Sequence, residues 1–140
     1  MSRINYSDDE EFGGQFALWQ ANCRRSLRSK RGRAALEELE AALVAMPVKR
    51  LIRGAIEKHG EVCAVGAVIR ARGLLAEVDE CELTDEVAEE LLGYPRLVAW
   101  KLVELNDESL AHDTPEERYE HVLAYVRKFL GRAHTPAGGP

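Results

Sequence analysis

The chain has 140 residues, of which 46% are hydrophobic and 31% are charged, and its formal net charge is −5. A chain of this length and composition can bury a core of its own, and its odd count of three cysteines argues against a fully paired disulfide scaffold and favours a reducing compartment. The start of the chain lacks the pattern of a secretory signal, and the longest apolar run, VCAVGAVI, is too short to cross a bilayer, so we expect a cytoplasmic protein with no membrane partner.

Apolar residues recur at helical spacing along most of the chain, between two polar ends. We predict a disordered acidic tail over residues 1–14, a helical domain over 15–131 and a flexible tail over 132–140. The first predicted helix carries an apolar stripe formed by Phe16, Trp19, Cys23 and Leu27.

Three further helices are predicted in the middle of the chain. The segment AALEELEAALVAM has a strong helix-forming composition and stops at Pro47. The next helix is expected between Pro47 and Gly60, because its apolar residues have helical spacing: Val48, Leu51, Ile52, Ala55 and Ile56. The third is expected from about Glu61 to Gly73.

Capping residues mark two helices in the second half of the chain. Thr84 is the expected N-cap of DEVAEELL, which ends at Gly93, and Pro95 then allows the apolar segment RLVAWKLVEL to begin a new helix.

The last predicted helix has the clearest start signal. Thr114, Pro115 and Glu117 form a predicted capping box, and Gly131 ends the helix. Its inner face is expected to contain Tyr119, Val122, Leu123, Val126, Phe129 and Leu130. No segment alternates with a period of two over a useful length, so we predict an all-α fold, a compact single-domain array of about six or seven short helices.

Five segments, taken in order, resemble a loose group of small uncharacterised helical proteins encoded by tailed phages and prophages. They are LWQANCRRSL, AALEELEAALVAMPVKRLI, GEVCAVGA, LND and TPEERYEHVLAYVRKFL, and they span most of residues 15–130. The resemblance implies an accessory protein in the cytoplasm of a bacterial host cell, which binds host or defence machinery. It implies no catalytic residue.

Cys63 is the first candidate for chemistry, because a thiol near a helix N-terminus has a lowered pKa and His59 could assist it. However, Cys63 belongs to a run of small residues that suits close helix packing, and no second acid or histidine has the spacing to orient His59. We favour a packing role for Cys63.

A basic segment, RRSLRSKRGR over residues 24–33, is the first candidate binding surface. Its cations are Arg24, Arg25, Arg28, Lys30, Arg31 and Arg33, and Lys49, Arg50 and Arg53 are expected to extend the patch. Arg24, Arg28 and Arg31 are expected to share one helical face. The patch could bind phosphates or an acidic protein, or be neutralised by the acidic half of the chain, and no aromatic residue interleaves its arginines.

An acidic run between residues 77 and 90 is the second candidate surface. Its carboxylates are Glu77, Asp79, Glu80, Glu82, Asp85, Glu86, Glu89 and Glu90. The run could mimic a phosphate backbone or capture a basic partner, although a solvated face is the simpler interpretation. The charge balance is +7 over residues 14–73 and −9 over 74–140, so the two halves of the chain are opposite in charge.

Other motifs are weaker. Residues 83–102 have a helix–glycine–helix pattern, but the supposed DNA-reading helix is mostly apolar, so a buried helix hairpin is favoured over a helix-turn-helix motif. The four histidines match no metal signature, and no phosphate-binding or nucleophile-elbow motif is present. We expect no cofactor, and LND at 105–107 most simply ends a helix.

The favoured function is that of a non-enzymatic interaction protein, which binds a host or defence protein complex stoichiometrically through its charged faces and can inhibit it. The alternative is a nucleic-acid-binding accessory protein that uses residues 24–33. A Cys63-dependent enzyme is the least favoured. Because the two halves have opposite charge, a homo-oligomer is also compatible with the sequence.

Overall fold

Six α-helices account for most of the residues that the structure, a computed structural model, describes: 8–78, 82–107 and 114–134. The helices are α1 (Asp8–Arg28), α2 (Lys30–Ala45), α3 (Ala64–Ala71), α4 (Asp85–Leu92), α5 (Arg96–Asp107) and α6 (Pro115–Leu130). A short 3-10 helix, η2 (Leu75–Glu77), follows α3, and a small antiparallel hairpin precedes it, formed by β1 (Glu57–Lys58) and β2 (Glu61–Val62). The predicted all-α fold is confirmed.

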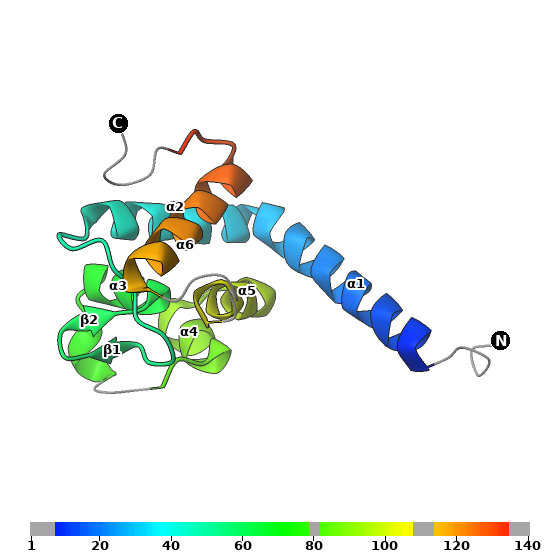
Figure 1. Cartoon of the computed structure of the whole chain (residues 1–140), viewed down its shortest axis with the longest axis horizontal. Coiled ribbons are helices and arrows are strands. Elements are labelled where there is room, and N and C mark those ends of the chain that lie inside the picture. The colour runs from blue at the N-terminus through cyan, green and yellow to red at the C-terminus, as the bar shows by residue number, and fades with distance from the viewer. Residues whose placement is uncertain (1–7, 79–81, 108–113, 135–140) are drawn as a thin grey trace.

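Helix α2 lies across the domain and packs against α1, α3 and α6, while α5 packs against α1, α3, α4 and α6 (Figure 1). The N-terminal half of α1 projects away from this body. Because α1 begins at Asp8, the second half of the segment that we predicted as a disordered tail is helical, and residues 1–7 lie outside the described part. Adding residues to a helix whose C-terminal half is already stabilised by packing costs little free energy, because the unfavourable nucleation step has already occurred.

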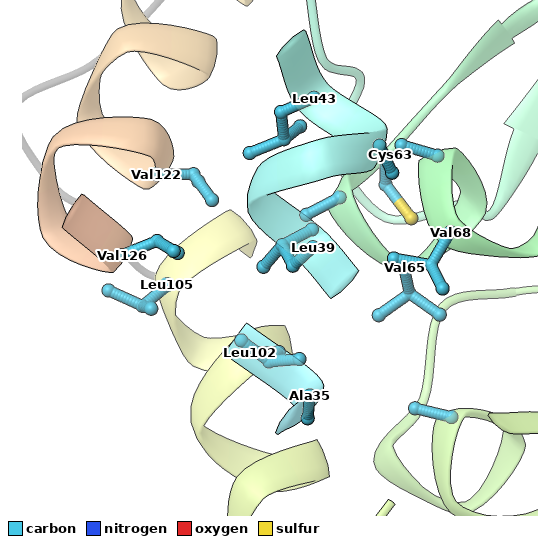
Figure 2. Close-up of a cluster of buried hydrophobic side chains, with 14 of the residues drawn as sticks. Ala35, Leu39, Leu43, Cys63, Val65, Val68, Leu102, Leu105, Val122 and Val126 are labelled. Carbon is cyan, nitrogen blue, oxygen red and sulfur yellow. The ribbon is translucent and has the colours of Figure 1, made fainter. Parts of the chain in front are cut away.

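The core fills the space between α2, α3, α5 and α6 (Figure 2). Each of these helices contributes buried aliphatic side chains at helical spacing, among them Leu39, Val68, Leu102 and Val122. The predicted inner face of α6 is confirmed as buried, except that Phe129 is only partly covered.

The helix caps that we predicted are confirmed. Thr84 accepts a hydrogen bond from the Val87 N–H at 3.2 Å, and α4 ends at Gly93 with a left-handed φ of 72°. Thr114 and Glu117 form the capping box of α6, which ends at Gly131. Such caps involve residues close in sequence, so the pattern alone identifies them.

The basic segment is divided by a break between α1 and α2. Ser29 is the N-cap of α2, where its hydroxyl accepts from the Gly32 N–H at 3.1 Å. A Cβ on Gly32 would lie 2.0 Å from the Ser26 carbonyl oxygen, so only glycine fits where the two helices turn. The expectation that Arg24, Arg28 and Arg31 share one helical face is therefore wrong, because the last of them belongs to a different helix.

The helix predicted between Pro47 and Gly60 is also wrong. The segment is irregular and leads into the β1–β2 hairpin, with left-handed φ angles at Gly54, His59 and Gly60. Its backbone pairs with distant partners: the Leu51 N–H donates to the Pro115 carbonyl, that of Ile52 to Val62, and that of Leu83 to Gly54. Leu51 and Ile56, whose spacing suggested a helix, are instead buried along an irregular path.

Asn106, in the LND segment, holds this irregular segment onto α5. The side chain is 1% exposed, and its Oδ1 accepts from the Ala64 N–H at 3.0 Å while its Nδ2 donates to the Ile52 carbonyl at 2.9 Å. Asp107 Oδ1 accepts from Asn106 Nδ2 and from the Gly54 N–H. The LND segment therefore does more than end a helix, since it satisfies backbone groups that no regular element pairs.

Candidate functional site

Cys63 lies inside the core between α2 and α3, with no exposed surface (Figure 2). It is the N-cap of α3, and its Sγ accepts from the Gly66 N–H at 3.2 Å. Burial raises the pKa of the thiol to about 12, which outweighs the effect of the helix N-terminus. His59 is exposed on the hairpin turn. These observations favour the packing role that we preferred.

We therefore expect Cys63 to resist modification in the folded protein. At neutral pH a thiol with this pKa and no exposure should react with an aromatic disulfide reagent at least about a hundredfold more slowly than in the unfolded chain. Mass spectrometry of peptides after timed labelling, with and without denaturant, measures this ratio for each cysteine. Rapid native labelling of Cys63 ahead of Cys23 would contradict it.

The basic segment is exposed at all six of its cations, three on α1 and three at the start of α2. Arg31 donates to the Gly93 carbonyl at 2.8 Å, and Arg33 pairs with Glu37 at 3.7 Å. Arg24, Arg25 and Arg28 lie on the last turns of α1.

Lys49, Arg50 and Arg53 do not extend this patch, contrary to our prediction. They follow the C-terminal end of α2, whose sixteen residues place that end about 24 Å from Lys30. Arg50 forms salt bridges with Glu61 and Glu116 at 3.3 and 3.5 Å, and Lys49 donates to the Val44 and Met46 carbonyls.

The acidic run forms a separate surface on and before α4. Glu82, Glu86, Glu89 and Glu90 are exposed, and Asp85 lies in the first turn of the helix. Asp79, Glu80 and the side chain of Glu77 lie outside the described part. Among the described side chains, no salt bridge joins this run to residues 24–33. Capture of a basic partner by this run stays a prediction.

The α4–Gly93–α5 unit is a buried helix hairpin, as we favoured. Val98, Ala99 and Leu102 of α5 belong to the core, so these positions of the supposed DNA-reading helix are not accessible to a duplex.

A cleft of about 420 Å³ opens where α1, α5 and α6 meet. We call it the α1–α6 cleft, and its lining residues are Gln20, Cys23, Arg24, Leu27, Arg28, Lys101, Tyr125, Lys128 and Phe129. Leu27 and Cys23 are buried and contribute apolar surface, whereas four cations come from three different helices. Only Arg24 and Arg28 of these cations belong to the predicted basic patch.

Two aromatic side chains from α6 stand beside the arginines of α1. The rings of Tyr125 and Phe129 are stacked at 26° with centroids 5.9 Å apart. The Arg28 guanidinium lies 5.5 Å from the Phe129 centroid, and Lys101 Nζ lies 5.4 Å from that of Tyr125. No aromatic residue interleaves the arginines in the sequence, but the fold brings Phe129, about a hundred positions away, next to Arg28.

The α1–α6 cleft carries positive charge at neutral pH. Burial raises the pKa of Tyr125, with the Glu104 carboxylate adding to the rise and Arg24 opposing it, so the phenol is neutral. Burial likewise raises the pKa of the Cys23 thiol. Glu104 accepts from Lys101 at 2.6 Å and offsets part of the charge at one wall. The other cations of the cleft, together with its apolar lining, suit an anion that also offers apolar surface.

The described residues contain no group of histidines, cysteines and carboxylates arranged to hold a metal ion. No helix in the described ranges is long and apolar enough to cross a membrane. Comparison of the chain with protein-family models, curated proteins and solved structures finds no match. A proposal about function therefore starts from the site itself.

Proposed function

We propose that the protein works by stoichiometric association and that the α1–α6 cleft binds an acidic segment of a protein partner. The convergence of four cations and an apolar floor on one cleft supports this proposal more than any other observation. A segment with carboxylates around an apolar or aromatic anchor would bury the anchor against Leu27 and Phe129 while its charges meet the rim. The resemblance to phage-encoded accessory proteins supports a partner from a bacterial host or defence complex.

The aromatic pair also suggests single-stranded nucleic acid, which is the second candidate. Two features favour a protein partner. Arg28 and Lys101 already lie near the ring faces of Phe129 and Tyr125, where a base would have to stack. The net charge of −5 also opposes the approach of a long polyanion.

Reversing two charges at the cleft tests the proposal. We expect the double variant Arg24→Glu/Arg28→Glu to weaken binding of a fluorescent peptide rich in glutamate with one central phenylalanine by about tenfold or more, because rim cations become repulsive. Both residues are exposed, so the fold should be retained. Fluorescence anisotropy at two salt concentrations measures the affinity, which should fall as salt rises.

Arg53→Glu is the matched control, since Arg53 is exposed on the segment before the hairpin and does not line the cleft. It should change the affinity by less than about twofold. Equal losses in both variants would contradict a localised site. Tighter, salt-sensitive binding of labelled oligothymidine, lost in the double variant, would favour nucleic acid instead.

A further inference from the structure

The side of α4 that faces away from the core is acidic. Glu86, Glu89 and Glu90 are exposed, and the helix contains no basic residue. Val87 and Leu91 lie one turn apart beside these carboxylates and are only partly covered by the core. We call these five residues the acidic face of α4. This face therefore offers three carboxylates next to an apolar margin.

The acidic face has no cationic partner among the described side chains of its own chain. None of its three carboxylates takes part in a salt bridge there. Helix α4 packs against α3 and α5, and none of its residues lines the α1–α6 cleft. Because Glu86 and Glu90 lie one turn apart and repel each other, a cation from outside the chain would stabilise this face.

The α1–α6 cleft presents the complementary charges. Of its four cations, Lys101 is paired with Glu104. The other three form no salt bridge with a described side chain, and they are Arg24, Arg28 and Lys128. These cations stand around an apolar lining, as the carboxylates of α4 stand beside an apolar margin. Matched charges around apolar surface favour encounter and fix orientation, so a second copy of the chain brings a fitting occupant for the cleft.

We propose that the acidic face of α4 of one copy occupies the α1–α6 cleft of a second copy, so that self-association competes with the acidic partner. The inference rests on the proposed function for the preference of the cleft for acidic segments, and it adds a regulation of that site. The contact joins two different surfaces and is therefore head-to-tail, so an open row of copies keeps one free cleft at one end only. Rising protein concentration would withdraw clefts from the partner.

Sedimentation velocity over a range of protein concentrations, at low and high salt, tests the association. The mass of the wild-type chain should rise above 15.6 kDa with concentration and fall back at high salt. Arg24→Glu/Arg28→Glu should raise the dissociation constant about tenfold or more, because the contact becomes repulsive, and Glu86→Gln/Glu90→Gln should raise it several-fold. All four side chains are exposed, and circular dichroism checks that both variants are folded.

Glu116→Gln/Glu117→Gln is the matched control for the change on α4. It removes the same charge from the first turn of α6, which belongs to neither surface, and glutamine also serves in a capping box. It should change the dissociation constant by less than about twofold. A wild-type chain that sediments as one copy throughout, or equal losses in the control and in the α4 variant, would overturn the proposal.

An equimolar mixture of the cleft variant and the α4 variant tests the head-to-tail direction. Each variant loses one surface and keeps the other, so the mixture should form complexes of two chains and nothing larger, although each variant alone sediments mainly as one copy. A mixture that associates no better than its components would overturn the arrangement.

The glutamate-rich peptide that tests the cleft separates this inference from the proposed function. It should bind the wild-type chain and lower the mass of the associated species, because both occupants need the same cations. Peptide binding by a chain that never associates would overturn self-association alone. Association that depends on Arg24 and Arg28, without peptide binding, would overturn the proposed partner and leave self-association as the role of the cleft.

Discussion

Replacing Asn106 with alanine should lower the free energy of unfolding by about 3 kcal/mol, because a buried amide loses several hydrogen bonds together. The change leaves the Ala64 N–H and the Ile52 carbonyl without the partners that Asn106 provides at 3.0 and 2.9 Å. Asn106 is 1% exposed, so water does not replace its amide easily. Urea unfolding followed by circular dichroism measures the loss.

Asn22→Ala is the matched control for this prediction. Asn22 also uses its side-chain oxygen, which accepts from Arg25 at 2.9 Å, but the bond is exposed. Its removal should change the free energy of unfolding by less than about 0.5 kcal/mol. A loss at Asn106 no larger than that of the control would show that the irregular segment is held by other contacts.

Gly66→Ala should destabilise the protein by about 3 kcal/mol, although alanine is the better helix former by about 1 kcal/mol. A Cβ at this position would lie 2.2 Å from the Ile56 carbonyl oxygen and 3.0 Å from Val62 Cβ, so the chain leading into the hairpin would have to move away from α3. A lower free energy of unfolding would therefore show that packing dominates, and a higher one that helix propensity dominates. Thermal and urea unfolding both report it.

Ala34→Gly is the control, because it changes helix propensity without a close backbone contact. Ala34 is exposed within α2, and its change to glycine should cost about 1 kcal/mol through helix propensity alone. Stabilisation by Gly66→Ala would contradict the close approach of the Ile56 backbone to α3.

Local signals predicted the helix ends well and the long-range contacts poorly. The caps at Thr84 and Thr114 involve residues three positions apart, so sequence spacing is sufficient to identify them. The segment from Pro47 to Gly60 was predicted wrongly because its apolar spacing also fits an irregular path. The partners that stabilise that path, Pro115 and Asn106, lie more than fifty residues away.

The candidate site was predicted only in part for the same reason. Arg24 and Arg28 were identified from the density of basic residues. Tyr125 and Phe129 occur at positions i and i+4 of a predicted helix, but nothing local shows which helix their shared face meets. The break at Ser29, which separates Arg31 from the two arginines of the cleft, has a serine cap signal that the run of basic residues obscured.

The contact between Trp19 and Trp100 has a practical consequence. These are the chain's two tryptophans, and their rings meet edge to face at 5.4 Å between α1 and α5. Any event that lifts α1 away from α5 must change the surroundings of both indoles at once. Intrinsic emission therefore provides an optical signal for movement of α1, without a label and without background from a tryptophan elsewhere in the chain.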